Sequence, residues 1–263
     1  MRVRLLARSL GLGTAAALSL CTYDAAADPI AYAEQPPRYV RIDFGTGTTD
    51  TIGSLSQYFF VGAFADDDFS QEYAIDYPFG DLYSIDTTTA ETTLIGSTNI
   101  SGESPTALQW DPVDNYMLLM TDYASCDGGN FYALDIATGA TMSIGVHDGC
   151  LERLAFDAAG HAFSIDIAAE TLVELGADTV GPLGFDAAFI SALFFDSATG
   201  ALYLIAEDVD LRSNNMYIVD TTTGHATLVA PWVGYTAFAI AGSDTPMDTI
   251  FASGFDSQVQ MPR

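Results

Sequence analysis

The sequence predicts an all-β fold, a five-bladed β-propeller closed by one C-terminal and three N-terminal strands. Three observations lead to this prediction. One strand motif recurs roughly every 40 to 50 residues, a second hairpin motif lies between its copies, and the strands form complete sheets only if the two ends of the chain share one. Each four-stranded sheet of such a fold is called a blade.

The first motif is a short apolar strand that ends in Asp, followed by a turn and a second strand. Its clearest copy is Leu82-Tyr83-Ser84-Ile85-Asp86, which leads to Leu94-Ile95-Gly96. Further copies begin at Tyr39, Phe131 and Met216, and a weaker copy begins at Thr171. The spacing of the copies is typical of a four-stranded propeller blade.

The second motif is a hairpin between these copies. It reads Leu154-Ala155-Phe156-Asp157 into Ala162-Phe163-Ser164-Ile165, with related copies that start at Leu108 and Leu193 and a degenerate copy at Phe60. Short runs of β-branched and aromatic residues that end in Asp, Thr or Gly turns are typical of strands. The two motifs together give four strands per repeat, which we letter A to D from the axis outward.

The strand count gives the number of blades and the way in which the ring closes. Complete sets occupy about residues 58–97, 105–146, 152–183 and 190–231. One A strand is left at 236–240, and three strands are left at 30–33, 39–43 and 51–53. These four would complete a fifth blade, and a closed ring has no open sheet edge that could template aggregation.

The chain divides into three expected parts: a signal peptide at 1–27, the propeller at 28–243 and a tail at 244–263. Three arginines precede an apolar stretch at 10–20 and the small residues Ala25-Ala26-Ala27, which is the pattern of a secretory signal. A lipoprotein signal at Cys21 is the alternative, but Leu20 stands where a small residue is expected. We therefore expect a secreted, periplasmic or extracellular protein.

Composition limits the class of partner. The chain has 35 acidic residues and eight basic ones, for a formal net charge of −27. Such a surface repels phosphate backbones, so no nucleic-acid partner is expected. No stretch is apolar for about 18 residues, so no membrane span is expected. With 49% hydrophobic residues the chain can bury a core, and we expect a folded monomer.

The sequence predicts a disulfide between Cys126 and Cys150. In the blade arrangement Cys126 falls in a loop between strands B and C, and Cys150 falls in the connector that leaves the same blade. Both kinds of loop emerge on one face of a propeller, and an oxidising compartment favours pairing.

The repeats resemble those of secreted bacterial propeller-type proteins that contain a domain of unknown function. The shared pattern, L-Y-x-I-D-x-x-T-G-x-x-T-L-I-G alternating with L-A-F-D-x-x-x-G-x-L-Y, covers about residues 29–243. This resemblance implies an architecture and no reaction. The tail segment 248–256 is similar to the D-x-I-F-x-x-G-F-acid ending of exported proteins from some Gram-negative bacteria. It is either a sorting tag or a segment that packs on a blade.

The residues offer one candidate catalytic group, His147, Glu152 and Arg153, on the face that contains Cys126 and Cys150. Such a group could serve acid–base chemistry, so a glycan-processing hydrolase is the alternative function. The competing interpretation makes Glu152 and Arg153 a surface ion pair and leaves His147 in solvent. The inner strands look apolar where the carboxylates of a glycosidase would project, so we expect a binding protein rather than an enzyme.

Aromatic residues in the loops of that face favour binding. Aromatic clusters with charged rims are typical of sugar and protein recognition surfaces. The sequence therefore predicts a non-catalytic propeller that presents loops to a glycan or an extracellular protein. The candidate ligand-binding residues are Tyr58, Phe59, Tyr123, Trp232 and Tyr235, with Tyr77, Phe79 and Phe189 on the same face.

Calcium is the one cofactor that the sequence suggests. Asp208 and Asp210 lie in an acidic loop, and carboxylate oxygens at alternate positions suit calcium. Two other acidic loops, at 66–68 and around Asp127, have the same character. None of the three matches an EF-hand loop, so solvated loops without metal remain the alternative.

Overall fold

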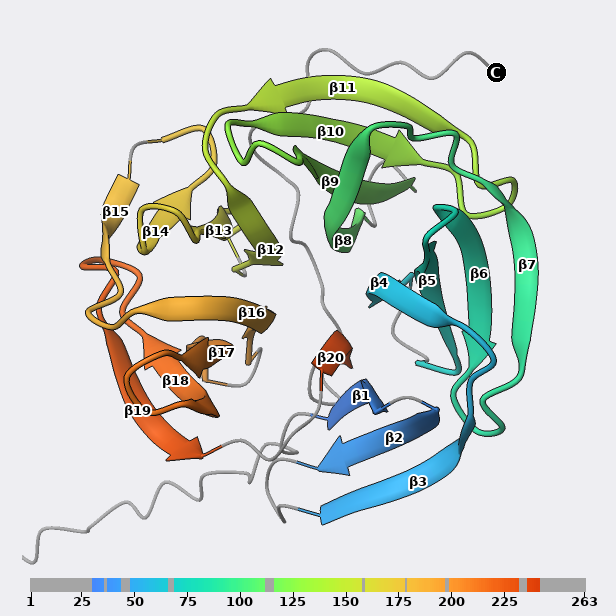
Figure 1. Cartoon of the computed structure of the whole chain (residues 1–263), viewed down its shortest axis with the longest axis horizontal. Helices are drawn as coiled ribbons and strands as arrows, with labels where there is room; N and C mark the ends of the chain where they lie inside the picture. The colour runs from blue at the N-terminus through green and yellow to red at the C-terminus, as the bar shows by residue number, and fades with distance from the viewer. Residues whose placement is uncertain are drawn as a thin grey trace, which may run out of the picture.

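A computed structural model describes residues 30–35, 37–43, 48–65, 69–111, 116–157, 159–177, 179–196, 199–231 and 236–241. These residues form twenty strands in five four-stranded antiparallel sheets, and no helix occurs among them. The five sheets stand around a central axis (Figure 1). The predicted all-β five-bladed propeller is confirmed. The expected signal peptide and tail lie outside the described residues.

The strands of each blade follow one another from the axis outward. The closing blade contains β20 (Thr236–Ala241), β1 (Ile30–Gln35), β2 (Arg38–Asp43) and β3 (Thr48–Ser54). The second contains β4 (Tyr58–Phe64), β5 (Gln71–Tyr77), β6 (Asp81–Asp86) and β7 (Thr92–Ser97). The third contains β8 (Glu103–Asp111), β9 (Tyr116–Tyr123), β10 (Gly129–Leu134) and β11 (Thr141–His147). The fourth contains β12 (Leu151–Phe156), β13 (Ala162–Asp166), β14 (Thr171–Glu174) and β15 (Thr179–Pro182). The fifth contains β16 (Ala187–Phe195), β17 (Leu202–Asp208), β18 (Ser213–Val219) and β19 (Ala226–Pro231).

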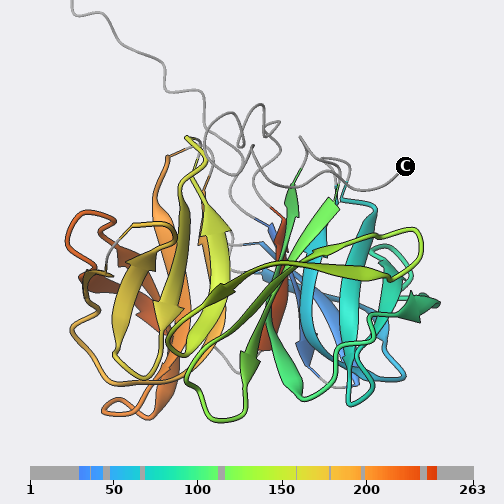
Figure 2. The ribbon, with the colours of Figure 1, turned by 90° about the horizontal axis from the view of Figure 1, so that it is seen from above.

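The ring closes as the strand count predicts. β20 pairs antiparallel with β1, with Ala241 opposite Ile30 and Ile240 opposite Ala31. It also contacts the innermost strands of both adjacent blades, β4 and β16. Figure 2 shows β20 in red near the middle of the ring, beside the blue N-terminal strands. One sheet is thus built from the two ends of the described chain.

The core lies between neighbouring blades. Ile165 and Leu172 of the fourth blade are buried in one cluster with Ile190 and Leu204 of the fifth. Burying a large aliphatic side chain stabilises the fold by roughly 1.5–3 kcal/mol, so each interface contributes to holding the ring. β9 is buried from Tyr116 to Asp122 because it is an inner strand covered on both faces.

Turns between strands C and D show why the repeat needs Asp and Gly. The carboxylate of Asp135 accepts a hydrogen bond from the Ala137 amide at 2.8 Å, and Gly139 adopts a positive φ of 78°. The second blade has Ala90 at this position with φ 61°. Its methyl group is buried beside Tyr39 and Leu55, and this packing offsets the strain of the left-handed conformation.

We call the side of the ring that carries the β9–β10 loop and the β11–β12 connector the loop face. On it Cys126 and Cys150 form a disulfide, with 4.5 Å between their Cα atoms. This bond ties a loop of the third blade to the connector that enters the fourth. The described residues include no helix long and apolar enough to cross a membrane.

Candidate functional site

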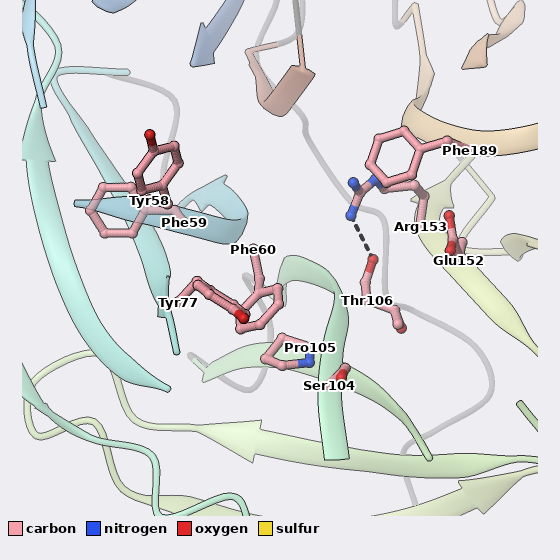
Figure 3. Close-up of a pocket in the computed structure, with 10 residues that line it drawn as sticks. All are labelled: Tyr58, Phe59, Phe60, Tyr77, Ser104, Pro105, Thr106, Glu152, Arg153 and Phe189. Atoms are coloured by element: carbon pink, nitrogen blue, oxygen red, sulfur yellow. Dashed lines mark hydrogen bonds between the residues drawn. The ribbon is translucent and has the colours of Figure 1, made fainter. Parts of the chain in front are cut away.

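A cavity of about 520 Å³ opens at the axis on the loop face, where the innermost strands begin (Figure 3). We call it the axial pocket. This volume is in the range of small-ligand sites, roughly 300–1,000 Å³. The lining comes from β4, β8, β12 and β16, with one residue from the end of β5. Its residues are Tyr58, Phe59, Phe60, Tyr77, Ser104, Pro105, Thr106, Glu152, Arg153 and Phe189.

One side of the axial pocket is aromatic. Tyr58 and Tyr77 are 60% and 58% exposed, which is unusual for such large rings. Tyr77 packs edge-on against Phe60, with ring centroids 5.0 Å apart. Phe59 lies beneath at 4% exposure and packs against Tyr83. The aromatic side thus has a buried base and exposed rings that a flat apolar ligand could stack on.

The opposite side carries two charged residues that are consecutive in β12, Glu152 and Arg153. Consecutive residues of a regular strand point to opposite faces. Here the β12–β13 register shifts by one residue between Glu152 and Ala155, and Arg153 has φ 62°. This β-bulge allows both side chains to reach the same cavity.

Arg153 links three blades. Its Nε donates a hydrogen bond to the Ser191 carbonyl at 3.1 Å, and its Nη1 donates one to the Thr106 carbonyl at 2.9 Å. Burial lowers the pKa of Arg153, while the charge of Glu152 raises it. No carboxylate oxygen among the described residues lies within 4.0 Å of the guanidinium.

Glu152 is held beside it. Its Oε2 accepts a hydrogen bond from the Ile190 amide at 3.3 Å. Burial raises the pKa of Glu152, and the Arg153 charge and the Ile190 amide act in the opposite direction. Glu152 is the one carboxylate among the described residues that line the pocket. The expectation that the inner strands are apolar at this level was therefore wrong at β12.

His147 does not join Glu152 and Arg153 in the axial pocket. Its side chain is only 5% exposed, packs against Phe131, and donates from Nε2 to the Thr121 carbonyl at 2.9 Å. The expected solvated His147 and the expected Glu152–Arg153 surface ion pair were both wrong. The bulge and the packing of β11 separate the three residues into two sites.

His147 instead lies beside Asp122, a residue that belongs to none of the motifs predicted to carry function. His147 Nε2 is 3.6 Å from Asp122 Oδ1, and the Asp122 side chain is 7% exposed. Burial, with the nearby charges of Glu152 and Asp166, raises the pKa of Asp122 to about 7. Asp122 Oδ1 has no hydrogen-bond partner among the described residues. A carboxylate oxygen of Asp122 lies within 4.8 Å of the sulfur atoms of Cys126 and Cys150.

The other predicted ligand-binding residues do not line the axial pocket or lie outside the described residues. Tyr123 is exposed on the loop face outside the pocket, and its hydroxyl accepts a hydrogen bond from Asn130 at 2.9 Å. Trp232 and Tyr235 lie outside the described residues. Phe189, by contrast, lines the pocket and is 41% exposed.

Of the two candidate calcium ligands, Asp208 is engaged within the protein and Asp210 is exposed. The Asp208 carboxylate accepts hydrogen bonds from the Tyr217 hydroxyl at 2.7 Å and from the Leu211 amide at 3.0 Å. Asp210 is exposed in the turn that follows. The acidic run at 66–68 lies outside the described residues, and calcium binding stays a prediction.

The fold and the pocket define a class: a five-bladed β-propeller with an aromatic axial pocket. No family model and no curated protein matches the chain. Similar solved structures show the fold alone, and the identities of five of them range from 10% to 16%.

A chain from a nidogen/laminin complex has 12% identity and a TM-score of 0.53, with 81% of this chain and 97% of that chain covered. A Bacteroides thetaiotaomicron protein of unknown function has 14% identity and a TM-score of 0.54, with 84% of this chain and 65% of that chain covered. A candidate gluconolactonase has 12% identity and a TM-score of 0.53, with 81% of this chain and 79% of that chain covered. The fold is thus shared with binding proteins and enzymes, and it does not choose between them.

Proposed function

We propose that this protein is an exported, non-catalytic binding protein whose axial pocket takes a glycan. The observation that supports this most is the set of exposed rings around the pocket, from Tyr58, Tyr77 and Phe189. Sugars present apolar C–H faces that stack on aromatic rings, and their hydroxyls bond to a few well-placed polar groups. Glu152 and Arg153 are such groups.

The number of carboxylates in the pocket lining favours a binding function over glycoside hydrolysis. Glycoside hydrolysis commonly uses two carboxyl groups that flank the scissile bond. The described lining contains Glu152 alone, and Asp122 lies with His147 outside it. The hydrolase alternative would need its second carboxyl from residues that the structure does not describe.

Export is part of the proposal. The Cys126–Cys150 disulfide is consistent with an oxidising compartment. The expected signal at 1–27 and the strongly acidic composition support a periplasmic or extracellular location with a glycan or protein partner. The expected tail at 244–263 and the monomeric state stay predictions.

Replacing Tyr77 by Ala is expected to weaken glycan binding about tenfold, because it removes an exposed ring that a sugar would stack on. Isothermal titration with oligosaccharides identified on a glycan array measures the change. Tyr123→Ala is the matched control, since Tyr123 is exposed on the same face but outside the pocket. Equal affinities of the two variants, or no binding to any glycan, would contradict the proposal.

Incubation with the same oligosaccharides is expected to release no cleavage product, which chromatography of the reducing ends would check. Turnover by the native protein that disappears in Glu152→Gln would instead establish the hydrolase. This variant keeps the size of the side chain, so lost turnover would report on the carboxyl group.

A further inference from the structure

No carboxylate oxygen of the described residues lies within 4.0 Å of the Arg153 guanidinium in the axial pocket. We propose that the pocket selects saccharides that carry a carboxylate, such as uronic acids, and that Arg153 binds this carboxylate. This inference rests on the proposed function and deepens it, because it names the class of glycan.

The charge balance of the chain makes Arg153 unusual. The chain has 35 acidic residues and eight basic ones, so a carboxylate partner for an arginine is readily available. Burying a guanidinium away from water is costly, and buried charges are normally paired. Yet the partners of Arg153 among the described residues are two backbone carbonyls, of Ser191 and Thr106. These carbonyls are neutral, so among the described residues the opposing charge comes from Glu152, which lies beyond ion-pair distance.

The hydrogen bonds of Arg153 also leave donors for a ligand. A guanidinium has five N–H groups, and the two carbonyls take one from Nε and one from Nη1. Among the described residues, none accepts a hydrogen bond from Nη2. Because the two carbonyls belong to β8 and β16, they fix the plane of the guanidinium at the pocket wall. A planar, fixed fork matches the two oxygens of a carboxylate.

The geometry of the pocket suits a ring with an acidic substituent. Figure 3 shows Arg153 reaching toward Thr106, while Tyr58, Phe60 and Tyr77 lie across the cavity. A sugar ring stacked on the aromatic side would direct a substituent toward the guanidinium. The pocket thus offers a ligand an aromatic surface on one side and a cation on the other.

The negative charge of Glu152 repels an anionic ligand. It therefore limits how strongly the pocket prefers an acidic sugar to a neutral one. Its carboxylate lines the same cavity, and like charges repel strongly where water is scarce. The Ile190 amide holds one of its oxygens. Removing the charge of Glu152 should therefore strengthen the binding of an acidic sugar and leave a neutral sugar unchanged.

The decisive experiment varies the ligand and leaves the protein intact. Titration calorimetry would compare the methyl glycoside of galacturonic acid, which carries a single charge, with the methyl ester of the same sugar, which keeps the ring and removes the charge. We expect the acid to bind at least tenfold more tightly. Equal affinities would overturn the inference and leave the proposed function standing, whereas no binding of either, or of neutral glycans, would overturn both. A peptide with a free C-terminal carboxylate is a further arm: if it binds and no saccharide does, the ligand class is wrong.

Two variants test the residues. Arg153→Gln should lose the preference for the acid over the ester, and thermal melting would show whether it remains folded. Glu152→Gln leaves the Arg153 contacts in place and should bind the acid several-fold more tightly, with the ester unchanged. If Glu152→Gln leaves the affinity for the acid unchanged, the carboxylate of the ligand does not bind near Glu152 and Arg153. The inference then fails, even if Arg153→Gln does not fold and cannot be tested.

Discussion

Replacing Cys126 and Cys150 together by Ser is expected to lower the free energy of unfolding by about 3 kcal/mol. The disulfide closes a loop with a sequence separation of 24, and a cross-link of this length limits the freedom of the unfolded chain by roughly that amount. For a domain of this size the melting temperature should fall by roughly 6–12 °C. Urea unfolding, followed by tryptophan fluorescence, measures the change.

Ser125→Ala is a suitable control, because it alters the same exposed loop without removing the cross-link. A reducing agent added to the native protein should reproduce the loss seen in the double variant and leave the double variant unaffected. An unfolding curve of the double variant that superimposes on the native curve would contradict the prediction.

Replacing Asp122 by Asn is expected to stabilise the protein at pH 8 and to have little effect near pH 4. The pKa of Asp122 is about 7 in the folded protein and about 3.9 in an unfolded chain. Between these values the folded state binds more protons, so its stability rises as the pH falls from 7 to 4. Above pH 7 the buried charge costs up to about 4 kcal/mol, and asparagine avoids this cost. Melting temperatures from pH 4 to pH 8 measure the difference between variant and native protein.

Asp86→Asn provides a control of opposite sign. Hydrogen bonds from Thr88 and Thr89 lower the pKa of this exposed turn residue, so its contribution is present at neutral pH and is lost in acid. At each pH the melting temperature of the native protein is subtracted from that of the variant. This subtraction cancels the contribution of the other acidic residues, which titrate in both proteins. A pH-independent effect of Asp122→Asn would show that Asp122 is ionised in the folded protein throughout this range.

The repeat made the fold predictable, because every blade repeats the same short apolar strands and the same Asp turns. Even the closing sheet followed, since β20 and β1 to β3 were the strands left unpaired by the count. The position of Tyr58 near the axis also followed from the strand count, because the loops that lead into the innermost strands surround the axis.

The charged groups were harder to place, because their positions depend on departures from the repeat. Glu152 and Arg153 share a cavity only because β12 contains a bulge and Arg153 adopts a positive φ. The bulged segment itself, residues 151–155, contains no Gly or Pro that would indicate this. Asp122 is the penultimate residue of an ordinary strand, β9, and its burial beside His147 depends on how the third blade packs against the connector that follows it. Such long-range packing has no local signature.

Pairing of β20 with β1 also sets the order of events during synthesis. β1, β2 and β3 leave the ribosome first, yet their innermost neighbour comes from residues 236–241, after all four other blades. A nascent chain therefore cannot complete the ring until nearly all of the described sequence has emerged. Under the proposed export, this late ring closure would leave the chain unfolded for longer, and an unfolded chain is what a threading translocation machinery requires.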